Sequence, residues 1–190
     1  MPLSLKVDDI NSRSHAADTL PEAFNLRCQD AWQLCGEGIF SWSVFRFYRA
    51  RLLTQTGVFN PAKPFLLDLH YLRTLMGQQI VSTSMDEMAR LNVLTQDQRD
   101  SWTQALAEIM PDVCLGDRLL GWFIPDSHVE FYSATHALGH IKDPEFVRIF
   151  SAIWLDDRTR SPALRQALLG QKSDAIAPQS TPLLTSAAGI

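Results

Sequence analysis

The sequence predicts an α+β fold, in which an antiparallel β-sheet packs against a layer of helices. Runs rich in Phe, Trp, Val, Tyr and Leu occupy residues 31–53, 65–72 and 119–132, and such runs are typical of strands. Apolar residues recur at helical spacing in residues 75–92, 95–110 and 143–170. Because the strands and helices come in groups and do not alternate, the expected sheet is antiparallel. A chain of 190 residues, of which 46% are hydrophobic, is long enough for one domain with a full core.

The first strands are expected at residues 31–38, which end in a Gly-Glu-Gly sequence, and at residues 39–53. If residues 39–53 form one strand, alternate side chains share a face. That face would hold Trp42, Val44, Arg46, Tyr48, Ala50 and Leu52. Neither face of this run is wholly polar, so we expect a central strand covered on both sides. The next strand is expected at residues 65–72. Its core face would hold Phe65, Leu67, Leu69 and Tyr71.

Two helices are expected between residues 75 and 110. The apolar stripe of the first consists of Ile80, Val81, Met85, Met88 and Leu91. Ser84 and Glu87 form a candidate internal capping box, which would divide this helix. The second helix begins at Thr95, whose hydroxyl forms a capping box with Gln98, and it ends at Pro111.

A hairpin and two further helices are expected in the last third of the domain. Residues 119–124 and 128–132 have the pattern of two strands around the Pro-Asp-Ser turn at 125–127. Asp143 is an N-cap carboxylate in front of a proline, so a helix starts there. Ser161 starts the last helix in the same way, and Gly170 ends it.

Composition divides the chain into three parts and limits the classes of partner. Residues 1–26 are expected to form an irregular N-terminal arm, residues 27–170 the folded domain and residues 171–190 a disordered tail. A net charge of −4 and a pI of about 5.7 argue against nucleic acid as a partner. No apolar run approaches the ~20 residues of a transmembrane segment. Because no secretion signal is present, the chain is expected to be cytoplasmic; it would be periplasmic if a signal peptide has been removed.

No metal ion, cofactor or disulfide framework is expected. Cys28, Cys35 and Cys114 contain no Cys-x-x-Cys pair and are expected to be small buried hydrophobic residues. His136 and His140 are four residues apart, but the Glu that follows the first His in zinc-binding helices is absent.

Three blocks of sequence occur in a particular order. The first is LCGEG at residues 34–38, followed by FRFYRARL at 45–52. The second is LHYLR at residues 69–73, leading into QQI at 78–80. The third is GHIKDPEF at residues 139–146, followed by IWLD at 153–156 and LRQALLG at 164–170. In this order and spacing, over residues 34–170, the blocks resemble the bacterial chalcone isomerase-like proteins.

The resemblance implies the chalcone isomerase fold, an open-faced β-sandwich in which an antiparallel sheet packs against a helical layer, with a cleft between them. In plant isomerases this cleft cyclises a chalcone to a flavanone with the help of an arginine after the Gly-x-Gly sequence, whereas non-catalytic relatives hold fatty acids. Phe40 stands at the place of that arginine, and Tyr48 stands where the plant enzymes have a threonine. The missing cation weakens the case for an isomerase, because ring closure needs stabilisation of an enolate-like oxygen.

Arg46 and Tyr48 are the main candidate site residues. At positions i and i+2 of a strand they place one cation and one hydroxyl among apolar side chains, which suits a carboxylate with an acyl tail. Trp42, Tyr71 and Arg73 complete the expected ligand-binding set. The alternative is that Arg46 lies at the surface with Tyr48 in the core, and that Arg73 ties a strand to a helix through an ion pair.

These observations favour a non-catalytic protein that binds a small amphipathic ligand, such as a fatty acid, in the cleft between sheet and helices. Two other functions remain open. One is an isomerase or lyase acting on a phenolic or enone substrate of the chalcone type, with Tyr48 as donor and Arg46 in place of the missing cation. The other is a protein-interaction module with a closed cleft.

Overall fold

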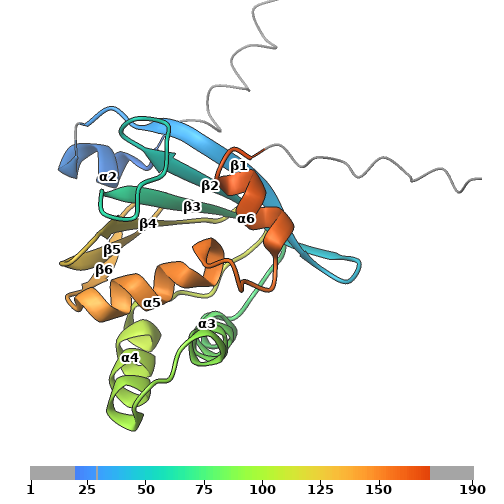
Figure 1. Cartoon of the computed structure of the whole chain (residues 1–190), viewed down its shortest axis with the longest axis vertical. Coiled ribbons are helices and arrows are strands. Elements are labelled where there is room, and N and C mark those ends of the chain that lie inside the picture. Colours follow the sequence, from blue (N-terminus) through green and yellow to red (C-terminus); the bar gives the residue numbers. More distant parts are fainter. Residues whose placement is uncertain (1–19, 29, 172–190) are drawn as a thin grey trace, which may run out of the picture.

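The computed structural model describes residues 20–28 and 30–171, and these residues form an α+β fold with an open sheet (Figure 1). In this part of the chain a six-stranded sheet has its strands in sequence order, and every neighbouring pair is antiparallel. The strands are β1 (Gln33–Trp42), β2 (Phe45–Thr54), β3 (Phe65–Tyr71), β4 (Arg118–Ile124), β5 (His128–Ser133) and β6 (Ala137–Ile141). The helices are α2 (Glu22–Arg27), α3 (Gly77–Leu91), α4 (Gln96–Ile109), α5 (Pro144–Leu155) and α6 (Pro162–Leu168). The predicted fold class is confirmed.

Helices α3 to α6 form a layer on one face of the sheet (Figure 1). Helix α5 packs on β4 and β5, helix α6 packs on β1 and β2, and α3 contacts both α5 and α4. The opposite face is covered at one end by α2, whose Phe24 packs with Leu53, Leu66 and Leu120. The sheet is therefore covered by helices on one face and in part on the other.

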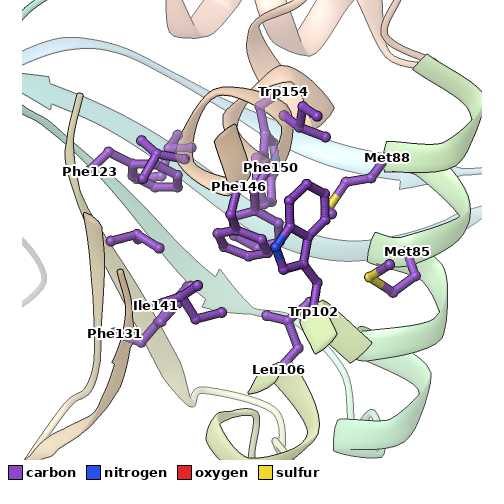
Figure 2. Close-up of a cluster of buried hydrophobic side chains, with 14 of the residues drawn as sticks. Met85, Met88, Trp102, Leu106, Phe123, Phe131, Ile141, Phe146, Phe150 and Trp154 are labelled. Atoms are coloured by element: carbon purple, nitrogen blue, oxygen red, sulfur yellow. The ribbon is translucent and has the colours of Figure 1, made fainter. Parts of the chain in front are cut away.

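The main core lies between the sheet and this helical layer (Figure 2). Phe65 and Leu67 of β3 contribute to it from the face that the sequence predicts. On α5, the ring of Phe150 lies 6.1 Å from that of Phe123 on β4 and 5.4 Å from that of Trp154. Figure 2 shows these aromatic rings between the sheet and the methionines of α3. Because aromatic rings bury large apolar areas, these rings fix α5 to β4 and β5.

Most of the predicted elements are confirmed. The predicted hairpin is β4 and β5, and the predicted helices are α3 to α6. The hydroxyl of Thr95 accepts a hydrogen bond from the backbone N–H of Gln98, as the capping box requires. The Asp143 carboxylate accepts hydrogen bonds from two backbone N–H groups in the first turn of α5. Gly170 has a φ of 67° just after the end of α6, which is the left-handed conformation that glycine favours.

The prediction of one strand over residues 39–53 is wrong. Strand β1 ends at Trp42, a turn follows at Ser43 and Val44, and β2 begins at Phe45. Ser43 takes the left-handed conformation of this turn, with a φ of 56°. Turns of this kind usually contain Gly, Asn or Asp, and none is present, so the sequence pattern does not reveal the turn. As a result, Gly-Glu-Gly lies inside β1, and β1 is an edge strand.

Three smaller differences concern single elements. The capping box at Ser84 does not divide α3, because the side chain of Glu87 forms ion pairs with Arg90 and Arg160. Strand β6 is absent from the predicted order, since its five residues alternate only weakly between polar and apolar. The end of the predicted arm forms α2, a six-residue helix in which only Phe24 is buried. Residues 1–19 of that arm and residues 172–190 of the predicted tail lie outside the described residues.

Two glycines of β1 allow α6 to lie directly on the sheet. A Cβ atom at Gly36 would lie 2.0 Å from the backbone oxygen of Ala167, and one at Gly38 would lie 2.9 Å from Cδ1 of Leu164. Side chains do not approach backbone so closely, so any larger residue at Gly36 would push α6 away from β1. The Gly-x-Gly sequence therefore allows the close contact between α6 and β1.

Basic side chains surround a buried carboxylate on the face of the sheet opposite to α3–α6. Asp68 of β3 is fully buried, and its carboxylate accepts hydrogen bonds of 2.6 and 2.7 Å from the guanidinium of Arg118. Nε2 of His70 lies 3.1 Å from this carboxylate, and Nε of Arg51 lies 3.4 Å from it. Burial alone would raise the pKa of Asp68, but the hydrogen bonds with His70 and Arg118 outweigh burial, so the pKa lies below its ordinary value.

Candidate functional site

A pocket of about 350 Å³ lies between the sheet and the helical layer. Residues from β1 to β5 line one side of it, and residues from α3, α5, α6 and the segment between α5 and α6 line the other. The lining is mostly apolar. It includes Leu67, Leu69, Ile80, Phe123, Phe131, Phe150, Ile153 and Leu164. Concave, mainly apolar pockets of roughly 300–1,000 Å³ are typical of small-molecule sites.

The pocket is open to solvent between the end of the β1–β2 hairpin, α3 and the segment that follows α5. Trp42, Gln79, Thr83 and Arg160 belong to its lining and are exposed, which places them at the opening. Buried rings, among them Phe123 and Phe150, line its interior, and Figure 2 shows these two rings in the core. The site thus combines a polar rim with an apolar interior.

Tyr48 of β2 lines the pocket and is held by three aromatic neighbours. Its ring stacks on Phe40 at a centroid distance of 5.1 Å and meets Tyr71 edge-on at 5.8 Å. Its hydroxyl oxygen accepts a 3.0 Å hydrogen bond from Nε1 of Trp154 on α5. Burial raises the pKa of the Tyr48 phenol, and the Glu87 carboxylate raises it further, although the bond from Trp154 opposes them. The phenol therefore stays protonated near neutral pH and keeps an O–H group to donate.

Arg46 does not line the pocket, because a β-bulge interrupts the alternation between Arg46 and Tyr48. In the register of β1 and β2, Phe40 lies opposite Tyr48 and the next residue, Ser41, lies opposite Arg46. Phe47 is the extra residue of this bulge, and both Phe47 and Tyr48 line the pocket. An extra residue shifts the side-chain period by one, so the shared face expected for Arg46 and Tyr48 is lost. Arg46 is exposed on the protein surface.

The other predicted site residues divide between the pocket and its surroundings. Trp42 and Tyr71 line the pocket, and burial raises the pKa of the Tyr71 phenol. Arg73 is outside the lining; its Cζ atom lies 5.1 Å from the ring centre of Phe45 and 4.9 Å from that of Phe47. At these distances Arg73 makes cation–π contacts that tie the segment after β3 to β2. This is a contact with aromatic rings, where the sequence suggested an ion pair.

The charged groups of the pocket are Glu87 and Arg160, which sequence reasoning did not select. Glu87 of α3 is buried and accepts hydrogen bonds of 3.1 and 3.0 Å from Nε of Arg90. Arg160, in the segment between α5 and α6, places its Nε 2.9 Å from Oε2 of Glu87, and its side chain is half exposed. Glu87 follows Ile80 and Ser84 at helical spacing on the pocket face of α3. An acidic residue in an otherwise mainly apolar stripe could therefore have identified Glu87 as a site candidate from the sequence. Arg160 lies in a loop, where no periodic pattern identifies it as a site candidate.

Residues 20–28 and 30–171 can be examined for metal-binding groups, cysteine thiols and helices that could cross a bilayer. In these residues no group of three or more His, Cys, Asp and Glu side chains is placed to hold a metal ion. Cys28, Cys35 and Cys114 are free thiols; Cys28 is buried as expected, whereas Cys35 is half-buried and Cys114 is exposed, so the expectation of burial is wrong for these two. Among the helices that these residues form, none has the length and apolar character needed to cross a bilayer.

Known proteins are similar to this chain in sequence and in fold. The sequence model of a family described as "Chalcone isomerase-like" matches residues 15–170. An uncharacterized protein of Haemophilus influenzae is 27% identical over 141 residues, which are 74% of this chain and 69% of that protein. The crystal structure of a fatty-acid binding protein of Arabidopsis thaliana has a TM-score of 0.60 at 11% identity, over 74% of this chain and 87% of that one, and so shares the fold. Because the family match spans most of the sequence, the chain belongs to the chalcone isomerase-like family.

Proposed function

We propose that this protein is a non-catalytic member of the family and binds a small amphipathic ligand of the fatty-acid type in the pocket. The observation that carries the proposal is the open, mostly apolar pocket of about 350 Å³ between sheet and helices. A core without a ligand is normally packed to high density and leaves few voids larger than a water molecule. An apolar space of this size at the surface therefore favours a ligand, and it counts against a closed interaction module.

The rim of the pocket suits the polar end of such a ligand. Glu87 is shared by Arg90 and Arg160, so two cations face one buried carboxylate. A ligand carboxylate can share Arg160 with Glu87 through a charge-assisted hydrogen bond. The hydroxyl of Tyr48 supplies a neutral donor in the same pocket. The acyl chain would then extend toward the buried rings.

The residue at the place of the isomerases' arginine favours binding over catalysis. Phe40 lines the pocket and stacks on Tyr48, so an apolar ring takes the place where a cation would steady a developing enolate. The raised pKa of Tyr48 makes its phenol a hydrogen-bond donor that is poor at giving up its proton. The fold neighbour from Arabidopsis thaliana, which is named as a fatty-acid binding protein, supports the same ligand class.

Native mass spectrometry of the purified protein tests this proposal. We expect a one-to-one complex with hexadecanoate, either already present after purification or formed when hexadecanoate is added, and its loss on denaturation. A protein that neither carries nor takes up hexadecanoate or shorter fatty acids would refute the proposed ligand class. Naringenin chalcone, added in the same way, should show no turnover above its spontaneous rate.

A further inference from the structure

The end of the β1–β2 hairpin is apolar and exposed. Trp42 is 57% exposed, Val44 85% and Phe45 56%, and the three follow one another around the turn. Figure 1 shows this hairpin, coloured blue to cyan, extending past α6, so its end has no helix over it. Single exposed apolar residues are common on proteins, but two aromatic rings and a valine at one turn are a continuous patch of the kind that binds a partner.

The surroundings of this patch carry positive charge. Arg46 is the arginine of β2 nearest the patch, whereas Arg49 and Arg51, farther along the strand, pair with Glu37 and Asp68. Arg46 lies two residues from Val44, is exposed, and has no ion pair among the described residues. Arg73 lies against the ring of Phe45. The end of the hairpin is thus an apolar tip with a basic base.

We propose that this tip docks on the surface of an anionic lipid bilayer. Tryptophan and phenylalanine favour the interface between lipid and water, and arginines near that surface are attracted by anionic headgroups. The turn needs to enter only the headgroup region, where water and headgroups can hydrogen-bond to the outer edge of β1, while the pairs of β1 and β2 satisfy the inner edge. A protein partner would not require basic charge around the apolar tip, whereas a bilayer of anionic lipid matches both features.

The tip is also continuous with the opening of the pocket. Trp42, at the tip, and Phe47, at its base, both line the pocket. Docking would bring the opening against the lipid surface, which is where a water-insoluble acyl ligand is stored. The docking itself does not depend on the proposed ligand, since the exposed tip and its charge exist whether or not the pocket is filled.

Flotation of the full-length protein with lipid vesicles tests the inference. Vesicles of phosphatidylcholine alone are compared with vesicles that also contain phosphatidylglycerol, each at low and high salt. We expect the protein to float with the phosphatidylglycerol vesicles and to bind them less at high salt. The double variant Trp42→Ser/Phe45→Ser should bind at least about tenfold more weakly, because both rings lose their apolar burial. The variant Arg46→Gln should bind anionic vesicles about fivefold more weakly than the wild type, and its binding to phosphatidylcholine vesicles should be unchanged.

The matched control is Val58→Ser/Val93→Ser, which removes two exposed apolar side chains from loops outside the hairpin. It should float as the wild type does, and all variants should unfold at similar temperatures because the changed side chains are exposed. Failure of the wild type to float with either vesicle would overturn the inference. Equal flotation of the wild type and the hairpin variant would also overturn it. So would light scattering that shows a dimer for the wild type and a monomer for the hairpin variant, with no vesicle binding by either.

Discussion

At the scale of single residues, the polar groups of the pocket form a small charged cluster in which Glu87 is central. Its carboxylate forms ion pairs with Arg90 and with Arg160, and of these two arginines Arg160 lines the pocket. A fatty-acid carboxylate that approaches Arg160 meets Glu87 as a competitor of the same charge. Loss of the Arg160 charge should therefore lower the affinity for a ligand carboxylate, and loss of the Glu87 charge should raise it.

We expect Arg160→Gln to weaken hexadecanoate binding and Glu87→Gln to strengthen it, each by about 1 kcal/mol, because the ion pair is half exposed and partly screened. Binding of hexadecanol, which has no charge, should change little in either variant. Arg148→Gln removes an exposed arginine of α5 that pairs with Glu145 and serves as the control. Isothermal titration of hexadecanoate and of hexadecanol into the wild type and the three variants measures these affinities. Shifts of the same sign for hexadecanoate in both pocket variants would contradict a shared carboxylate site.

Asp68 provides a residue-scale prediction about pH. Replacing it by Asn leaves Arg51 and Arg118 without their buried counterion, which should lower the free energy of unfolding at neutral pH by about 3 kcal/mol. The pKa of Asp68 is lowered in the folded state, so its contribution is complete above the unfolded pKa of about 4 and is lost as the pH falls through the folded pKa.

The stabilities of the wild type and of Asp68→Asn should therefore converge in acid. Urea unfolding between about pH 7 and about pH 3 checks this, with the exposed Asp86→Asn as control for a general loss of negative charge. A difference that stays constant over this range would show that Asp68 is not the titrating group.

At the scale of elements, the contact of α6 with β1 fixes one wall of the pocket. Leu164 of α6 lines the pocket, and α6 reaches β1 only because Gly36 and Gly38 have no side chains. We expect Gly36→Ala to lower the free energy of unfolding by about 1–3 kcal/mol, since the added Cβ would overlap the backbone of Ala167. Thermal or urea unfolding measures the effect. Ser41→Ala, at an exposed position of the same strand, should change stability by less than about 0.5 kcal/mol; equal effects of the two changes would contradict the packing account.

The elements also show how far the sequence could predict the fold. Strand β3, the β4–β5 hairpin and helices α3 to α6 carry their own signals, such as the Asp143 cap and the capping box at Thr95, and all were predictable. The division of β1 from β2 was not, because the turn at Ser43 contains no turn residue. The bulge at Phe47 also leaves no mark in the pattern, yet it decides that Tyr48 lines the pocket and Arg46 does not.

The charged part of the site was less predictable than its apolar part. Tyr48, Tyr71 and Trp42 could be chosen from the strand pattern and do line the pocket. Glu87 and Arg160 come together only because the α5–α6 segment folds back over α3. A contact between an irregular segment and a distant helix depends on tertiary packing, which local periodicity does not record.

At the scale of the whole molecule, the pocket exists because the helical layer covers the sheet incompletely. Helix α5 packs on β4 and β5, α6 packs on β1 and β2, and α3 packs on α5 (Figure 1). All three helices contribute residues to the pocket lining. The hairpin end and the pocket opening lie together in this arrangement, since Trp42 belongs to both. We therefore expect the protein to take an amphipathic ligand from a lipid surface and to hold it between its two layers.

Two variants of α3 show whether hexadecanoate binds between the sheet and the helices, when their affinities for it are compared with that of the wild type. Ser84→Phe places a large ring in the pocket lining, whereas Ser82→Phe places the same ring at an exposed position of the same helix that is outside the lining. If the pocket is the binding site, Ser84→Phe should lower the affinity at least tenfold, about 1.4 kcal/mol or more, and Ser82→Phe should bind as the wild type does. Equal affinities of both variants and the wild type would contradict a ligand site between the sheet and the helices.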